Sequence, residues 1–191
     1  MRKTLKAVSI VFGLTLIGFS LSGCVTINES AGPNGKMDGS SHHGSDHSMN
    51  ITDKKSFAEA MVPHHQQAID ISEFAASNTS NAGILAIAEK IIGEQAPEID
   101  KMTLWLEGKS VDYSMMMDGM LSPAQVAELK SAKESEFDQL YVEYMIQHHE
   151  GAVAMAADAL GIDDPELSEF TNTIIVSQSA EIEELLALVK N

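Results

Sequence analysis

The stretch Met61-Val62-Pro63-His64-His65-Gln66-Gln67-Ala68-Ile69 returns later in the chain as Met145-Ile146-Gln147-His148-His149-Glu150-Gly151-Ala152-Val153. Both copies have the pattern Met-x-x-His-His-x-x-Ala followed by an aliphatic residue. Each copy is followed by a second repeated phrase, Ile91-Ile92-x-x-Gln95-x-x-Glu98-Ile99 and then Ile174-Ile175-x-x-Gln178-x-x-Glu181-Ile182. Spacings of three and four residues mark one face of a helix, so the chain contains the same helix pair twice.

Working outward from these repeats, the pattern predicts four long amphipathic helices and one short one. We expect the first helix to begin at a cap formed by Thr52 or Asp53 and to end before a loop at residues 77–81. The others are expected at about residues 82–106, 123–133, 136–160 and 165–189, with a linker over residues 108–121. No strand-like alternation occurs. The sequence therefore predicts an all-α protein, a four-helix bundle of two tandem helix hairpins with internal pseudo-two-fold symmetry.

The first 23 residues have the layout of a bacterial secretory signal. Arg2, Lys3 and Lys6 precede an apolar run that closes on Leu21-Ser22-Gly23-Cys24. Small residues before the only cysteine of the chain resemble a lipoprotein cleavage site, so we expect residues 1–23 to be removed and Cys24 to carry lipid. The alternatives are a plain secretory signal or an uncleaved anchor. Localisation in the bacterial cell envelope, facing the periplasm or the exterior, follows from this interpretation.

Residues 24–52 are rich in Gly, Ser, Asn and His, with few bulky apolar residues, and are expected to form a flexible tether. His42, His43 and His47 lie there between Met37 and Met49, and short histidine-rich tracts often bind metal. The alternative is a polar spacer that contains histidines. Residues 53–191 would form the bundle domain.

The charge of the chain restricts its partners. The formal net charge is −16, and binding of nucleic acid needs a basic surface, so nucleic acid is not an expected partner. No P-loop, His-Glu-x-x-His, Gly-x-Ser-x-Gly or dinucleotide fingerprint occurs. The common signatures of enzymes are therefore missing from the sequence.

Polar residues occupy positions on the helix stripes that should face the core. These are His64, His148, Gln95, Gln178, Glu98 and Glu181. Burying such groups is costly unless they are paired or bind a metal. Two explanations stay open: a hydrogen-bond network in which the histidines donate to the glutamates, or a metal site between facing helices.

The residue before each double histidine indicates which metal such a site would hold. Met61 and Met145 stand where di-iron bundles have glutamate, and thioethers favour copper, above all Cu(I), over iron or manganese. The alternative for both methionines is core packing. His65 and His149 either complete the coordination or face a neighbouring helix. Zinc and silver are also possible ions.

The linker adds four thioethers within six residues, at positions 115–120. This cluster is either a soft-metal loop or an adaptable apolar lid. The predicted metal ligands of the whole chain are His64, His65, His148, His149, Met61, Met145, Glu98, Glu181, Met117, Met120, His42, His43 and His47.

The doubled His-His with its matching Gln-x-x-Glu resembles the family called domain of unknown function 305. The resemblance covers about residues 56–188 and includes Met102, Trp105, Gly119 and Met155. It implies a ferritin-like bundle exported by bacteria, with some members linked to copper binding or resistance. One departure is that Leu185 and Leu188 stand where Met102 and Trp105 would repeat.

The expected function is that of a lipid-anchored protein outside the cytoplasm that sequesters or transfers copper, with an envelope copper-handling protein as a possible partner. One alternative is a ferritin-like, metal-dependent oxidoreductase. The other is a structural module of the envelope stress response that binds no metal.

Overall fold

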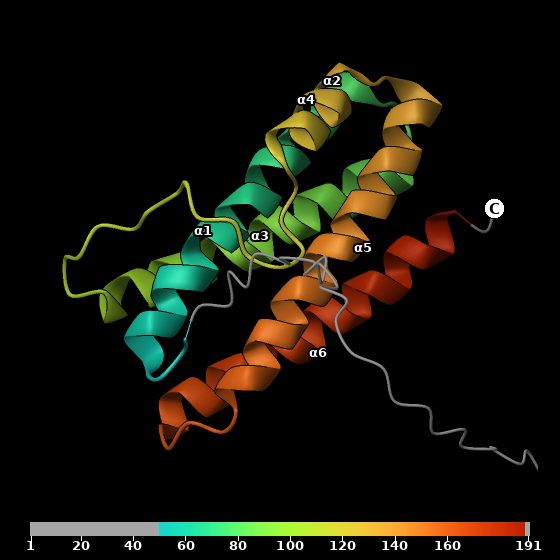
Figure 1. The fold of residues 1–191 in the computed structure, drawn as a ribbon. Helices are drawn as coiled ribbons and strands as arrows, with labels where there is room; N and C mark the ends of the chain where they lie inside the picture. The colour runs from blue at the N-terminus through green and yellow to red at the C-terminus, as the bar shows by residue number, and fades with distance from the viewer. Residues whose placement is uncertain (1–49, 190–191) are drawn as a thin grey trace, which may run out of the picture. The chain divides into compact units, whose positions relative to one another are not determined.

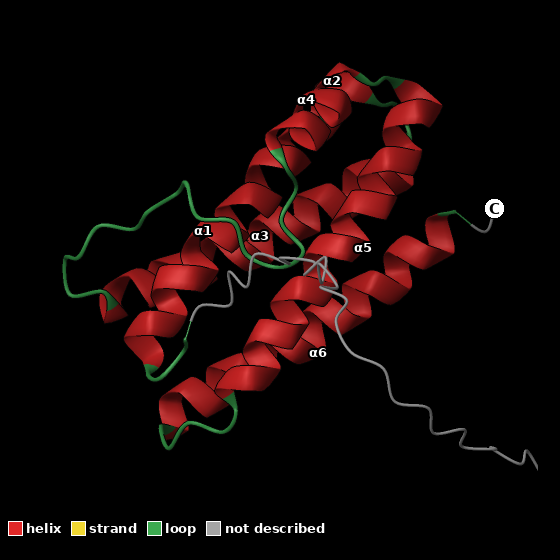
Figure 2. Cartoon of the chain, in the orientation of Figure 1, coloured by secondary structure: helices red, strands yellow, loops and turns green. Residues whose placement is uncertain are grey.

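The computed structural model describes residues 50–189 of the chain, which are helical with no strand in that range (Figures 1 and 2). The helices are α1 (Lys54–Glu73), α2 (Ala75–Asn78), α3 (Ala82–Trp105), α4 (Pro123–Ser131), α5 (Glu134–Ala159) and α6 (Pro165–Leu188). The predicted helical bundle is confirmed.

The four long helices form two hairpins. Helix α1 packs along α3, and α5 packs along α6 (Figure 1). Contacts between α1 and α5 and between α3 and α6 join one hairpin to the other. Each repeat of the sequence is therefore one hairpin.

The helix ends lie close to where the capping residues predict them. Asp53 and Ser56 form a capping box at the start of α1, and Ser122 does the same with Gln125 before α4. Asn81 caps α3 and Asp164 caps α6. The prolines at positions 63 and 97 lie inside α1 and α3, and both helices continue through them.

One predicted boundary is wrong. Residues 77 and 78 were expected in a loop, whereas Ala75–Asn78 form the short helix α2. The reason is a long-range contact: the Asn78 amide donates to the backbone oxygens of Lys130 and Ala132, both at 3.0 Å. This contact fixes the end of α2 against the end of α4, and local sequence does not reveal it.

Two apolar clusters fill the bundle and a polar layer separates them. Along α3, Ile84, Ile87 and Ile91 belong to the first cluster, Met102 and Trp105 belong to the second, and the polar pair Gln95 and Glu98 lies between. The order is the same along α5, and it is reversed along α1 and α6, which run from the second cluster through the polar residues to the first. We call the eight residues at this level the polar layer: His64, His65, Gln95, Glu98, His148, His149, Gln178 and Glu181.

Matching residues of the two repeats belong to opposite clusters. Met61 lies in the second cluster and Met145 in the first, and Ala68 and Ala152 are exchanged in the same way. The two hairpins therefore run in opposite directions across the polar layer, so the pseudo-two-fold axis passes through it. The internal symmetry predicted from the repeats is present in the packing.

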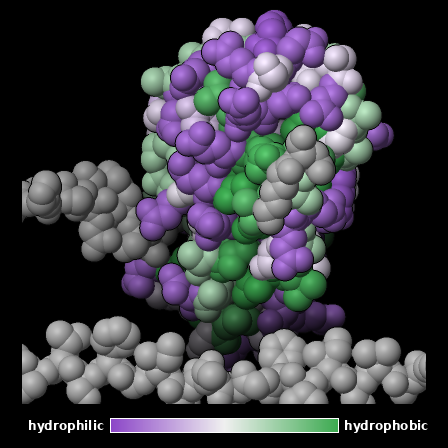
Figure 3. Space-filling model, turned by 90° about the vertical axis from the view of Figure 1, so that its right-hand side faces the viewer, coloured by the Kyte–Doolittle hydropathy of each residue, from purple (hydrophilic) through white to green (hydrophobic). Residues whose placement is uncertain are grey.

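On the face shown in Figure 3, a band of apolar side chains runs between hydrophilic side chains. The most exposed large apolar residues include Leu104 and Val176. Within residues 50–189, no helix is both long enough and apolar enough to cross a membrane.

Candidate functional site

The two repeats meet at the first histidine of each double histidine. The rings of His64 and His148 are 3.9 Å apart between centroids, at an interplanar angle of 43°. Both side chains are completely buried. The two motifs, far apart in the sequence, therefore form one centre in the middle of the bundle.

Backbone carbonyls fix the Nε2 atom of each of these rings. His64 Nε2 lies 3.1 Å from the carbonyl oxygen of Asp118, and His148 Nε2 lies 3.0 Å from that of His64. A carbonyl oxygen only accepts, so Nε2 must carry the hydrogen and donate it. In the neutral ring, Nδ1 is then left with a free lone pair.

The second histidine of each motif is held by a glutamate on the partner helix of its own hairpin. His65 Nε2 lies 2.8 Å from Glu98 Oε2, and His149 Nε2 lies 2.8 Å from Glu181 Oε2. The rings of His65 and His149 thus each bond a neighbouring helix through Nε2. Glu98 and Glu181 bond the second histidine of each motif, whereas His64 and His148 bond backbone carbonyls.

The two pairs differ in exposure. The Glu181 side chain is 1% exposed, whereas that of Glu98 is 14% exposed. Glu98 was expected on a core-facing position, and it lies at the rim of the polar layer. The His65–Glu98 pair therefore has partial access to water and the His149–Glu181 pair has none.

The polar layer contains many buried polar atoms without a partner. They are the Nδ1 atoms of all four histidines, both amide atoms of Gln95 and of Gln178, and Glu181 Oε1. Each such atom costs about 1–3 kcal/mol when it is left unsatisfied. The glutamines therefore do not bridge the network.

Burial keeps the central histidines neutral. Desolvation lowers the pKa of His64 to about 3, and the nearby His65 lowers it further. Desolvation and then His64 lower the pKa of His148 well below its ordinary value. Because a metal needs an unprotonated nitrogen, both Nδ1 atoms stay available as ligands at neutral and mildly acidic pH.

The end of the linker crosses the histidine centre. We call residues 117–121 the strap. Its Asp118 carbonyl accepts from His64, while its Leu121 backbone is bonded on both sides by Gln67, with Gln67 Nε2 to Leu121 O at 3.0 Å and Leu121 N to Gln67 Oε1 at 2.7 Å. Gln147 also donates to the Gly119 carbonyl, at 3.3 Å.

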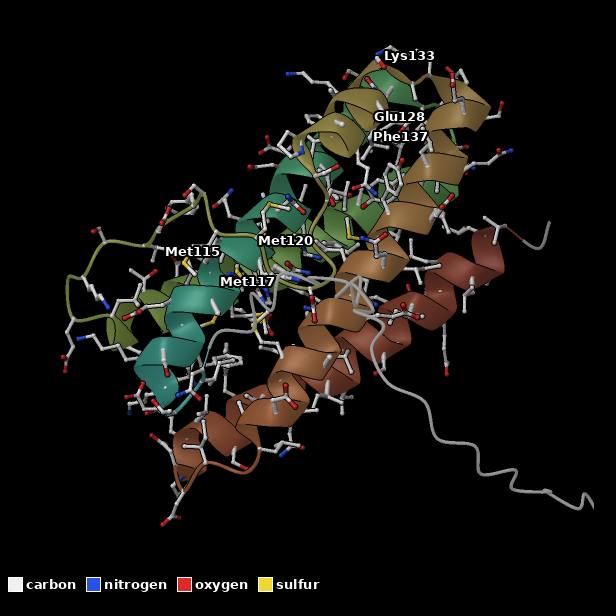
Figure 4. The ribbon with its side chains drawn as sticks, in the orientation of Figure 1. Met115, Met117, Met120, Glu128, Lys133 and Phe137 are labelled. Atoms are coloured by element: carbon white, nitrogen blue, oxygen red, sulfur yellow. The ribbon has the colours of Figure 1, made fainter. Side chains whose placement is uncertain are left out.

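The predicted methionine ligands lie around this centre. Met61 and Met145 are completely buried, one in each apolar cluster, and so flank the polar layer from its two sides. Met117 is buried on the strap, and Met120 is half-buried with its sulfur 3.4 Å from the Met117 backbone nitrogen. Figure 4 shows Met117 and Met120 where the linker passes between α1 and α5.

Within residues 50–189, no group of three or more His, Cys, Asp or Glu is arranged to hold a metal ion. The predicted ligands His42, His43 and His47 and the predicted lipid site Cys24 lie outside the described residues.

Sequence reasoning missed three residues that shape the centre. They are Gln67 and Gly151, which occupy the same position in the two repeats, and Asp118, which acts through its backbone. The available signal was that Gln67 and Gly151 differ in type at the same position of the two motif copies. The contact of Asp118 leaves no trace in the sequence.

Comparison with known proteins supports the same picture. The family model of DUF305, the domain of unknown function 305, matches residues 54–189. No curated protein matches the chain.

Three solved structures illustrate the likeness. CopM in its Cu(I)-bound form is 32% identical, with 74% of this chain and 98% of that chain covered and a TM-score of 0.63. A DUF305 fragment from Deinococcus radiodurans is 26% identical, with coverages of 72% and 95% and a TM-score of 0.65. A DUF305 protein from Streptomyces coelicolor is 24% identical, with coverages of 71% and 91% and a TM-score of 0.64, and it supports the fold alone.

CopM is also known in Cu(II)-bound, Ag-bound and apo forms. With its family model spanning all six helices and its repeats forming one centre, the chain belongs to the DUF305 family.

Proposed function

We propose that this protein binds a soft metal cation, copper or silver, in the polar layer, with Nδ1 of His64 and Nδ1 of His148 as nitrogen ligands. The proposal rests on one observation, that the four histidines have the same hydrogen-bonding arrangement. Each has Nε2 bonded to an oxygen, and each leaves Nδ1 buried without a partner. Such ligands are oriented and deprotonated before the metal arrives.

The sulfur atoms nearby favour a soft ion. Met61 and Met145 lie one helical turn before the central histidines, and Met117 and Met120 lie on the strap beside them. Thioethers select Cu(I) and the chemically similar Ag(I) over harder ions. CopM, which is 31–33% identical over nearly its whole length, binds both copper and silver.

The glutamates have a different part in this proposal. Glu98 and Glu181 hold the Nε2 sides of His65 and His149 at 2.8 Å. Carboxylates in this position fix the ring orientation and the tautomer of a histidine. We therefore assign them the role of orienting His65 and His149, and not that of binding the cation directly.

A silver titration of the purified full-length protein tests the proposal, because silver stays Ag(I) in air. Wild type is expected to bind silver with defined stoichiometry in calorimetry, and the double variant His64→Ala/His148→Ala is expected to lose the tight binding. Gln66→Ala is the matched control, since Gln66 lies beside the motif and bonds only Asp70 on its own helix.

A deletion within the tether tests whether the cation is bound by the polar layer or by the tether. Removing residues 41–49 should leave the tight silver site intact. Loss of binding in that deletion, with binding retained by His64→Ala/His148→Ala, would show that the cation is held outside the bundle.

We also propose that the protein acts outside the cytoplasm and is anchored by lipid on Cys24. This rests on the signal-like residues 1–23 and on the small residues before Cys24. Labelling of bacteria with a radioactive fatty acid should mark wild type but not Cys24→Ser. Equal labelling of both proteins would contradict this part of the proposal.

A further inference from the structure

The strap is fastened to both repeats, and by different means at the same position of the motif. Gln67 and Gly151 are equivalent, three residues after His64 and His148. Gln67 on α1 makes two hydrogen bonds to the Leu121 backbone, at 3.0 and 2.7 Å. Gly151 on α5 has no side chain that could bond the strap, and the space this leaves lets the strap pack closely against α5.

The approach at Gly151 leaves no room for any side chain. A Cβ atom at this position would collide with the backbone carbonyl of Asp118, and its neighbour Gly119 Cα would be only 2.8 Å away. On the strap, Gly119 has a φ of +83°, which favours glycine, and a Cβ there would lie 2.7 Å from the Gln147 oxygen. Backbone thus packs on backbone at this point.

The packing of the strap on Gly151 affects the histidine centre through the carbonyl oxygen of Asp118. The carbonyl that presses on Gly151 is that of Asp118, the same group that accepts the Nε2 hydrogen of His64 at 3.1 Å. Met117, which is buried, directly precedes Asp118, and Met120 follows Asp118 by two residues. The position of the strap therefore sets both the tautomer of His64 and the place of two thioethers.

We propose that Gln67 and Gly151 are positioning residues for the cation site: by seating the strap, they hold His64 in its Nδ1-available form and bring the sulfur atoms of Met117 and Met120 to the histidine pair. This inference rests on the proposed function. It assigns part of the specificity for soft ions to a break in the symmetry of the repeats, because the strap adds the sulfur atoms of Met117 and Met120 to those of the matched Met61 and Met145.

The inference predicts a particular pattern of affinities for silver. Gln67→Ala removes both bonds to Leu121 and is expected to weaken silver binding roughly 10- to 100-fold, the usual effect of losing a residue that orients a ligand. Gly151→Ala should have an effect in the same direction. Gln66→Ala, the neighbouring glutamine that does not touch the strap, should bind like wild type.

A double-mutant cycle distinguishes positioning from a general loss of stability. Met117→Leu/Met120→Leu removes the two sulfur atoms with little change in volume. If Gln67 acts through the strap, adding Gln67→Ala to this variant should weaken silver binding much less than it does in wild type. Calorimetric titrations of the four full-length proteins provide the comparison.

The outcomes separate the two proposals. Absence of silver binding by wild type would refute the proposed function itself. Tight binding by wild type with equal affinity in Gln67→Ala, or with effects of Gln67→Ala and of the methionine changes that simply add, would overturn the positioning inference and leave the histidine site standing.

Discussion

At the residue scale, His64 and His148 each have a buried Nδ1 atom without a hydrogen-bond partner. A histidine whose Nε2 is bonded to an oxygen and whose pKa is strongly lowered is a neutral base with one free lone pair. His64 and His148 both meet this description, 3.9 Å apart between ring centroids. Stability should therefore depend on pH in a specific way.

The metal-free protein is expected to lose stability as the pH falls below about 6.5. An unfolded chain protonates His64 near its ordinary pKa of 6.5, whereas the folded chain does so only at about 3, so protons favour unfolding between these values. The slope is at most about 1.4 kcal/mol per pH unit for each such histidine. Urea unfolding at several pH values, with chelator present, measures it.

The variant His64→Gln isolates the contribution of this ring, since glutamine does not titrate. Its stability should fall less steeply than that of wild type between pH 6.5 and pH 4. Identical slopes for the two proteins would show that His64 is accessible to protons in the folded state.

The two glutamates of the polar layer should differ in their importance for stability. Glu181→Ala leaves His149 Nε2 buried without a partner, which costs about 1–3 kcal/mol. Glu98→Ala should cost less, because the 14% exposure of Glu98 lets water take its place. Urea unfolding of the metal-free variants checks the order, with the exposed Glu183→Ala as control. Equal losses for Glu98→Ala and Glu181→Ala would contradict it.

Most residues of the polar layer could be predicted from the sequence, but their partners could not. The helix stripes placed His64, Gln95 and Glu98 towards the core because spacing alone determines the face of a helix. The acceptors of His64 and His148 are backbone carbonyls, which every residue has, so no sequence signal marks them. The partial exposure of the Glu98 side chain also depends on tertiary packing.

At the element scale, the helix ends lie close to the positions that the capping residues predict, except at α2. Asn78 joins α2 to the end of α4 through its amide, and Lys133 binds the Asn78 side-chain oxygen. No sequence pattern within residues 75–78 predicts this role. A four-residue helix depends on such contacts because it is too short to be stable alone.

Asn78→Ala should therefore destabilise the protein without affecting the cation site. Loss of the bond to Ala132 leaves a buried carbonyl oxygen unsatisfied, at a cost of about 1–3 kcal/mol, and the part-buried bond to Lys130 is lost as well. The contacts of Asn78 are remote from the polar layer. Thermal unfolding should show the loss while a silver titration of the folded protein gives the wild-type affinity. A large drop in affinity would mean that this end of the bundle shapes the site.

At the scale of the whole bundle, residues 50–189 form two apolar clusters that are exchanged by the pseudo-two-fold axis, with the polar layer between them. This layout could be predicted from the repeat, since equal stripes in antiparallel hairpins must bury equal faces. The strap could not, because it breaks the symmetry through Gln67 and Gly151. The strap can pack against α5 only because Gly151 has no side chain.

Cation binding should stabilise the whole fold by mass action. A ligand that binds only the folded state, at 100 times its Kd, adds about 2.7 kcal/mol. Differential scanning calorimetry in chloride-free buffer should show a rise in Tm with silver for wild type and none for His64→Ala/His148→Ala. An equal rise in both proteins would place the stabilising ion elsewhere.

The most direct test of the central claim is a crystal structure of the full-length protein grown with silver, with the ion located by its anomalous scattering. The account predicts a silver peak bonded to Nδ1 of His64 or of His148, with a methionine sulfur as a further ligand. A polar layer without silver, with the ion bound only by residues before position 50, would contradict it.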